Sequence, residues 1–137
     1  MDKEILERIP QRPPFLFVDK IVERGEDHIW VQKTLEGTED FFKGHFPGNP
    51  IMPGVLLQEA AFQGGALLMG GQGDGKIGVV TRVDKVKFRG LVKPQDTLDI
   101  KVEKTESLAN VIFFKGRIYV KDKCVLSLTF SCALVQQ

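Results

Sequence analysis

An apolar segment at residues 53–69 constrains the fold of this chain more than any other feature. Leu, Val, Ala, Phe and Met stand on nearly every side of the predicted helix, and Pro53 occupies a first-turn position that proline favours. A helix that is apolar all round must be enclosed by the rest of the protein. Because Gln58, Glu59 and Gln63 interrupt the segment, we interpret it as a buried helix rather than a membrane span.

Strands are predicted on both sides of this helix along the chain, after a short opening helix at residues 3–9. The predicted strands cover residues 15–23, 28–35, 77–88, 97–105, 110–120 and 124–134. The first two form a hairpin, and the last four are expected to form an antiparallel meander. One buried helix with a run of strands predicts an α+β fold in which the sheet wraps the helix. We expect residues 1–137 to form a single domain, because no low-complexity stretch or charge block divides them.

Composition and charge exclude several classes of partner. Nineteen basic and eighteen acidic residues give a formal charge of +1, so no global field draws the chain to nucleic acid or to an anionic membrane. Cys124 and Cys132 fall on one predicted strand, roughly 26 Å apart, too far for a disulfide. Free thiols suit a reducing compartment, and residues 1–8 do not resemble a secretory signal, so we expect a cytoplasmic protein.

Glu59 is the only charged residue of the predicted buried helix. An unpaired carboxylate is costly to bury unless it is hydrogen-bonded, paired or protonated. Val55, Phe62, Gln63 and Ala66 share the helical face of Glu59, which places the carboxyl in an apolar slot beside an amide. Such a setting tunes a carboxylic acid for proton transfer. The alternative is a glutamate on a narrow solvated stripe.

His45 lies in a loop at residues 44–54 that holds three glycines and three prolines. This density fixes an irregular backbone path, and a restrained imidazole is what a general base requires. The alternative is an ordinary surface histidine. His28, at the start of a predicted strand, lacks such a setting and is interpreted as structural.

Other chemical motifs are absent or out of context. Residues 73–78 match the spacing of a dinucleotide fingerprint, but they follow a helix and precede a strand, the reverse of the required order, so a flexible turn is predicted. No Cys or His pair has zinc-ligand spacing, and we expect neither a metal nor a cofactor. No serine or cysteine stands in a nucleophile motif, which counts against acyl-enzyme chemistry.

Residues 44–56, which read GHFPGNPIMPGVL, together with Glu59, Ala60 and Gln63, closely resemble the signature of β-hydroxyacyl-acyl-carrier-protein dehydratases. RPPFLFVD at residues 12–19 and VDKVKFR at residues 83–89 extend the resemblance over most of the chain. It implies a hot-dog fold, in which an antiparallel sheet wraps one long central helix. It also implies an obligate homodimer, usually a trimer of dimers, whose subunits share active sites. With glutamate at position 59, the chain resembles the branch of this dehydratase family that only dehydrates.

The resemblance implies dehydration of (3R)-hydroxyacyl-acyl-carrier-protein to trans-2-enoyl-acyl-carrier-protein in fatty acid biosynthesis. His45 would be the general base, and Glu59 of the opposite subunit the general acid. The backbone N–H of Gly54, unpaired at the helix N-terminus, would meet the thioester oxygen, and Gln63 would hold the carboxylate. The substrate tunnel would be lined by Phe46, Ile51, Pro53, Val55 and Phe62.

The expected partner is acyl carrier protein, which is acidic and presents the acyl substrate on phosphopantetheine. Lys85, Lys87 and Arg89 alternate along a predicted strand and would face this carrier, unless they form only a solvated strand face.

The chain departs from the family pattern at several positions. Gln11 and Pro14 stand where histidine and tyrosine are common, and Gln95 where glycine is usual. Residues 78–80 lack the aromatic residue often found gating the tunnel, so acyl-chain length and gating stay open. Two alternatives also stay open, namely a hot-dog acyl thioesterase and a non-catalytic acyl-binding module on the same fold.

Overall fold

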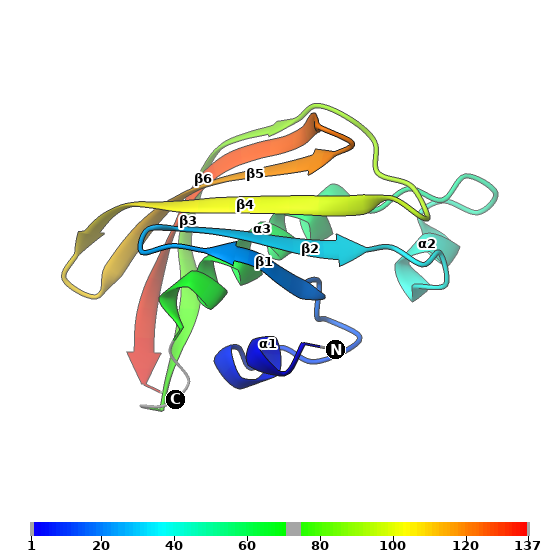
Figure 1. Cartoon of the computed structure of the whole chain (residues 1–137). Helices are drawn as coiled ribbons and strands as arrows, with labels where there is room; N and C mark the ends of the chain where they lie inside the picture. Colours follow the sequence, from blue (N-terminus) through cyan, green and yellow to red (C-terminus); the bar gives the residue numbers. More distant parts are fainter. Residues whose placement is uncertain (1, 71–74, 137) are drawn as a thin grey trace.

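A computed structural model describes residues 2–70 and 75–136, and shows a curved antiparallel sheet wrapped around one long helix (Figure 1). This is the predicted α+β architecture. The elements in chain order are α1 (Lys3–Arg8), β1 (Lys20–Arg24), β2 (His28–Thr34), α2 (Asp40–Gly44), α3 (Gly54–Met69), β3 (Lys76–Phe88), β4 (Thr97–Leu108), β5 (Val111–Val120) and β6 (Lys123–Gln136).

The six strands form one sheet in the order β1-β2-β4-β5-β6-β3, and every neighbouring pair is antiparallel. The predicted meander of the last four strands is therefore wrong for β3, which pairs with β6 rather than β4. Along the chain, α3 lies between β2 and β3 and crosses the concave face of the sheet. The chain therefore re-enters the sheet with β3 at the edge opposite β1 (Figure 1). Only β4, β5 and β6 form the meander.

Three local predictions also need correction. The first strand begins at Lys20 rather than at residue 15, because residues 15–17 bond to a helix side chain instead of to a strand. The single-turn helix α2 was not predicted, since five residues carry too little periodicity to reveal it. Of the predicted flexible turn at residues 73–78, residues 76–78 belong to β3 and residues 73 and 74 lie outside the described residues.

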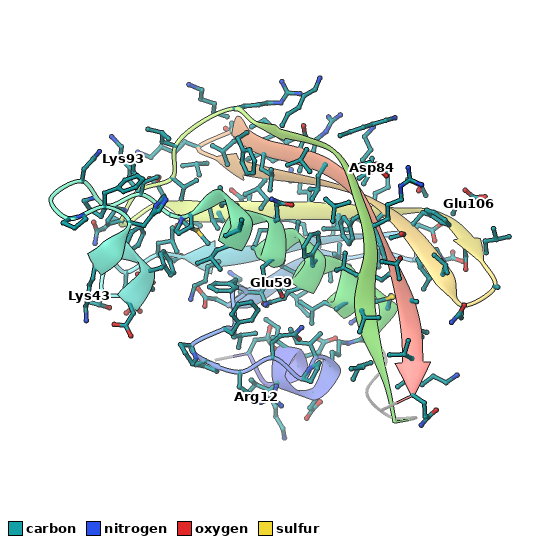
Figure 2. The ribbon with its side chains drawn as sticks, turned by 180° about the vertical axis from the view of Figure 1, so that it is seen from behind. Arg12, Lys43, Glu59, Asp84, Lys93 and Glu106 are labelled. Carbon is teal, nitrogen blue, oxygen red and sulfur yellow. The ribbon has the colours of Figure 1, made fainter. Side chains whose placement is uncertain are left out.

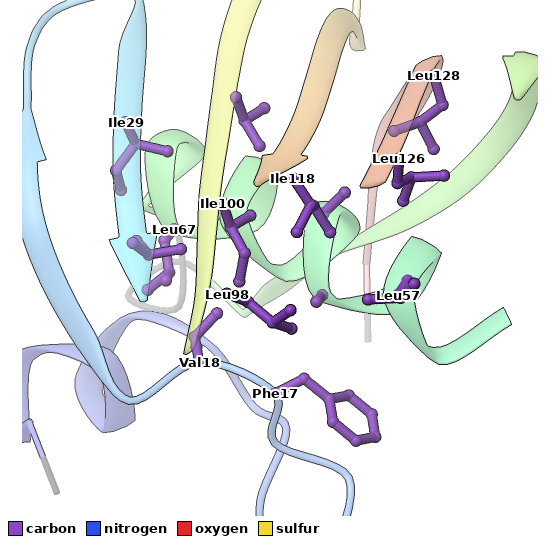
Figure 3. Packing of buried hydrophobic residues seen from close by; sticks show 14 of the residues in the cluster. Phe17, Val18, Ile29, Leu57, Leu67, Leu98, Ile100, Ile118, Leu126 and Leu128 are labelled. Carbon is purple, nitrogen blue, oxygen red and sulfur yellow. The ribbon is translucent and has the colours of Figure 1, made fainter. Parts of the chain in front are cut away.

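The core lies between α3 and the concave face of the sheet (Figure 3). Two glycines let the helix approach closely: a Cβ atom on Gly64 would lie 2.9 Å from Val102 Cγ2, and one on Gly65 would lie 3.0 Å from Phe130 Cζ. Most of α3 is enclosed, as predicted. Its first turn is not, because the side chain of Val55 is 69% exposed. The labelled core residues are Phe17, Val18, Ile29, Leu57, Leu67, Leu98, Ile100, Ile118, Leu126 and Leu128.

Both cysteines lie on β6 and are free, as predicted. Cys132 is buried, whereas Cys124 is half-buried. Within residues 2–70 and 75–136, no helix combines the length and the apolar character needed to cross a membrane.

Candidate active site

Glu59 lies half-buried on α3, facing the segment that leads from Arg12 into β1 (Figure 2). Gln63, one turn further along α3, is completely buried and donates from Nε2 to Glu59 Oε2 at 3.0 Å. The same amide accepts the backbone N–H of Phe17 at 2.8 Å and donates to the carbonyl oxygen of Phe15 at 2.9 Å. Two backbone contacts therefore fix the amide that holds the carboxyl group.

The surroundings of Glu59 favour its neutral form. Burial raises the pKa of the Glu59 carboxyl, and the hydrogen bond from Gln63 offsets part of that effect. Burial, followed by the negative charge of Glu59, raises the pKa of the Cys132 thiol to about 12. This thiol therefore stays protonated at neutral pH, so Cys132 offers no thiolate nucleophile. The raised pKa moves the Glu59 carboxyl toward neutral pH, where a proton donor is useful.

His45 directly follows α2, and its backbone N–H donates to the carbonyl oxygen of Phe41 at 3.1 Å. Its Nδ1 lies 2.9 Å from the carbonyl oxygen of Ile51, which can only accept a hydrogen bond. Nδ1 therefore carries the proton of the neutral ring, and Nε2 is left with a free lone pair. The ring of Phe46 stacks on the imidazole at a centroid distance of 4.0 Å. The loop thus fixes the ring and leaves Nε2 as a base.

The N-terminus of α3 begins at Gly54, and Pro53 before it makes no side-chain cap. The first backbone N–H groups of a helix have no partner within the helix, so that of Gly54 is available to a ligand oxygen. A Cβ atom on Gly54 would lie 2.6 Å from Cε1 of Phe88, the last residue of β3. Phe88, 54% exposed, was missed from the sequence because only the fold brings the end of β3 to this helix.

The predicted site residues fall into two groups. His45, Phe46, Ile51, Pro53 and Val55 lie in or beside the loop that enters α3, and Phe46 and Val55 are exposed. Glu59, Phe62 and Gln63 lie further along the helix, where Phe62 packs against Phe130 at 5.0 Å between ring centroids. Among the contacts of residues 2–70 and 75–136, none joins His45 to Glu59. Within the described part of one chain, the predicted acid and base therefore make no direct contact.

The outer face of the sheet carries a separate cavity of about 390 Å³ beside Trp30 and Tyr119, which neither His45 nor Glu59 lines. His28, interpreted as structural, lies at this cavity and contacts Glu23 at 2.8 Å. Within the described residues, no group of three His, Cys, Asp or Glu side chains is arranged to hold a metal ion.

Lys85, Lys87 and Arg89 line one shallow groove of about 150 Å³ on the sheet. Simple alternation does not explain their placement, because a β-bulge precedes Lys87 and Lys85 itself has a φ of 54°. Lys115 and Arg117 of β5 line the same groove. Lys115 and Arg117 were not predicted to join the groove, because β5 and β3 become near neighbours only through β6.

The family model described as a FabA-like domain matches residues 9–129 of the chain. The chain belongs to this family. FabA-like relatives include the 3-hydroxyacyl-[acyl-carrier-protein] dehydratase FabZ of Alkaliphilus metalliredigens, 46% identical over 93% of this chain and 90% of that protein. The enzyme of the same name from Caulobacter sp. is 41% identical over 97% of this chain and 85% of that protein.

Solved structures show the same fold at low sequence identity. The dehydratase heterocomplex ApeI:P from Xenorhabdus doucetiae matches with a TM-score of 0.85 at 15% identity, covering 97% of this chain and 91% of that chain. The E. coli PaaI protein matches with a TM-score of 0.67 at 17% identity, covering 83% of this chain and 81% of that chain. The predicted family and the predicted hot-dog fold are both confirmed. A shared fold does not by itself fix the reaction.

Proposed function

We propose that this chain is a hydro-lyase that converts (3R)-hydroxyacyl-acyl-carrier-protein to trans-2-enoyl-acyl-carrier-protein in fatty acid biosynthesis. The observation that carries this proposal is the half-buried Glu59 carboxyl, whose pKa is raised by burial and which a fully buried Gln63 holds in place. The relatives named 3-hydroxyacyl-[acyl-carrier-protein] dehydratase support the same reaction.

The proposed elimination needs a base that removes a proton from the α-carbon of the thioester and an acid that protonates the hydroxyl group on the β-carbon. The neutral His45 ring takes the α-proton on Nε2, because Nδ1 is already protonated against the Ile51 carbonyl. The electrons of the broken C–H bond form the α–β double bond while the β C–O bond breaks. Glu59 gives its proton to the departing hydroxyl, which leaves as water. The backbone N–H of Gly54 stabilises the negative charge that develops on the thioester oxygen.

A second copy of the chain would complete this site. The edge strand β3 exposes Val79 and Val80, at 37% and 39%, and an open strand edge favours pairing with another strand. Exposed Phe46 and Val55 add apolar surface beside His45. We therefore propose an obligate homodimer in which His45 of one subunit meets Glu59 of the other, with three such dimers forming a hexamer.

The proposed partner is acyl carrier protein with its phosphopantetheine-linked substrate. The groove of Lys85, Lys87 and Arg89, joined by Lys115 and Arg117, offers five positive charges to an acidic surface. Arg89 directly follows Phe88, whose ring lies against the start of α3, so one residue of the groove is adjacent in sequence to a residue at the proposed oxyanion site. A cytoplasmic location is part of the proposal, and the two free cysteines support it.

Incubation with crotonyl thioester separates the proposed function from its alternatives. A dehydratase run in reverse adds water to the double bond and keeps the thioester intact, whereas a thioesterase releases free thiol. A non-catalytic acyl-binding module does neither. We expect hydration, lost in Glu59→Gln and retained in the matched control Glu103→Gln on the outer face of the sheet. Thiol release without hydration, or no turnover at all, would contradict the proposal.

A further inference from the structure

The cavity of about 390 Å³ on the outer face of the sheet lies across β2, β4 and β5, which neighbour one another (Figure 1). Lys101 and Glu103 of β4 line it and alternate with the buried residues Ile100 and Val102, so they point away from α3. The volume of this cavity falls in the range of about 300–1,000 Å³ that is typical of small-ligand sites. Its size and its place on the far side of the sheet make it a candidate second site.

Trp30 of β2 and Tyr119 of β5 bring two aromatic rings to this cavity. The indole is held in place, because its Nε1 donates to Asp99 Oδ1 at 2.8 Å. Lys101 Nζ lies 4.7 Å from the centroid of the Trp30 ring and 5.4 Å from that of the Tyr119 ring. The lysine stem is flexible, and the contact of an ammonium group with an exposed ring is weak. A planar ligand can therefore take the place of the ammonium group on the indole.

The register of the sheet joins several of these side chains into one row at right angles to the strands. Each member stands opposite the next on the neighbouring strand, at a spacing of about 4.8 Å. This outer row runs from β1 to β3 through Glu23, Trp30, Lys101, Arg117, Ser127 and Lys87. It therefore presents, in order, a carboxylate, an aromatic ring and two adjacent cations, and it ends on a third cation.

The three cations of the outer row lack acidic partners. Lys101 and Arg117 stand directly opposite each other, and like charges in such positions repel. In the part of the chain that the structure describes, no carboxylate forms an ion pair with either of them or with Lys87. Glu103, the other carboxylate of the cavity, stands opposite Lys115 in the next row. An anion held between Lys101 and Arg117 therefore relieves their repulsion.

The order of groups along the outer row matches the order of groups in a nucleotide. Glu23 contacts His28 at 2.8 Å and can accept a further hydrogen bond from the amino group of a base. The indole of Trp30 offers the stacking surface for that base. Lys101 and Arg117 follow one and two strand spacings further on, where the phosphates of the same ligand would lie.

We propose that the outer row is a nucleotide-binding site, with the base on Trp30 and the phosphates between Lys101 and Arg117. The ammonium group of Lys101 leaves the indole when the base stacks there, and it turns to the phosphates. A third phosphate extends toward Ser127 and Lys87. The inference does not depend on the proposed dehydration, because no residue of the outer row takes part in that elimination.

The test uses the fluorescence of Trp30, which is the only tryptophan of the chain and therefore reports this site alone. ADP should quench that fluorescence and reach saturation, because its base stacks on the indole. Inorganic pyrophosphate should displace ADP and restore the fluorescence. Adenosine, which has no phosphates, should bind at least about tenfold more weakly. Coenzyme A carries the same base and phosphates, and its Kd relative to that of ADP shows whether a coenzyme or a free nucleotide is preferred.

Two variants and one control decide whether the outer row holds the phosphates. Arg117→Ala should raise the Kd of ADP about 10- to 150-fold, the range expected for loss of a hydrogen bond to a charged group. Lys87→Ala should weaken ATP more than ADP, because Lys87 stands at the far end of the row. Lys123→Ala is the matched control, since exposed Lys123 lines neither the cavity nor the basic groove, and its Kd should equal that of the wild type.

The urea midpoint of each variant shows that it is folded. Absence of saturable quenching by both ADP and coenzyme A would overturn the inference. So would an equal Kd of ADP for the Arg117→Ala and Lys123→Ala variants, together with an unchanged preference for ATP in Lys87→Ala.

Discussion

Replacement of Gln63 by leucine tests how the carboxyl group of the site is held. The side chain of Gln63 has no exposed surface and makes three hydrogen bonds, to Phe17 N, Phe15 O and Glu59 Oε2. Leucine has a similar size but can make none of them. The substitution therefore leaves polar groups of the neighbouring segment without their partner and frees the carboxyl of Glu59.

The magnitude follows from how deeply each partner is buried. The bond to Phe17 N is buried, and loss of a partner for a buried donor costs about 1–3 kcal/mol. The bonds to Phe15 O and Glu59 are only partly buried, so water can replace part of them. We expect the free energy of unfolding to fall by about 2–4 kcal/mol in total, a large share of the ~5–15 kcal/mol that stabilises a typical domain.

Urea unfolding at one fixed protein concentration measures this loss, because association shifts apparent stability. Gln32→Leu is the matched control, since Gln32 makes one half-buried bond to Asp99 and its loss should cost less than about 1 kcal/mol. Loss of the Gln63 bond also raises the pKa of Glu59 further, so the alkaline limb of the pH–rate profile should move to higher pH. Equal stability of the two variants and an unmoved limb would refute this reasoning.

Three further predictions concern the same site. Because burial raises the folded-state pKa of Glu59, the Glu59→Gln variant should be more stable than the wild type at neutral pH. The difference between their urea midpoints should close as the pH falls through that raised pKa. A difference that widens in acid would contradict this prediction. Gly54→Ala should lower kcat/KM on the order of a hundredfold by displacing Phe88, and Phe88→Ala in the same chain should recover activity; no recovery would argue against the contact. Alkylation at neutral pH, followed by mass spectrometry, should modify Cys124 well before Cys132, and equal rates would contradict the raised thiol pKa.

Local geometry explains which features the sequence predicted well. Glu59 and Gln63 are four residues apart on one helix, so their contact follows from helical spacing alone. The glycines and prolines around His45 predicted a loop without helix or strand, which holds from His45 to Pro53, whereas Gly44 belongs to the unpredicted helix α2. The structure adds that the carbonyl oxygen of Ile51 contacts the ring. The long helix was predicted within one residue, because its apolar residues and Pro53 mark its start.

Features that depend on strand order could not be predicted in this way. Phe88 lies far from Gly54 in sequence and reaches it only because β3 occupies the sheet edge beside β6. Lys115 and Arg117 join the basic groove for the same reason. The start of β1 was misplaced because residues 15–17 have the composition of a strand, while the buried amide of Gln63 takes their hydrogen bonds.

The central claim is that His45 and Glu59 act together only across two subunits. Two inactive variants, His45→Asn and Glu59→Gln, test it when equal amounts are mixed and allowed to exchange subunits. Half of the dimers are then mixed, and each mixed dimer holds one site with both native residues, so activity should return to about a quarter of the wild-type value. A mixture that stays inactive, although native mass spectrometry detects mixed dimers, would contradict the account.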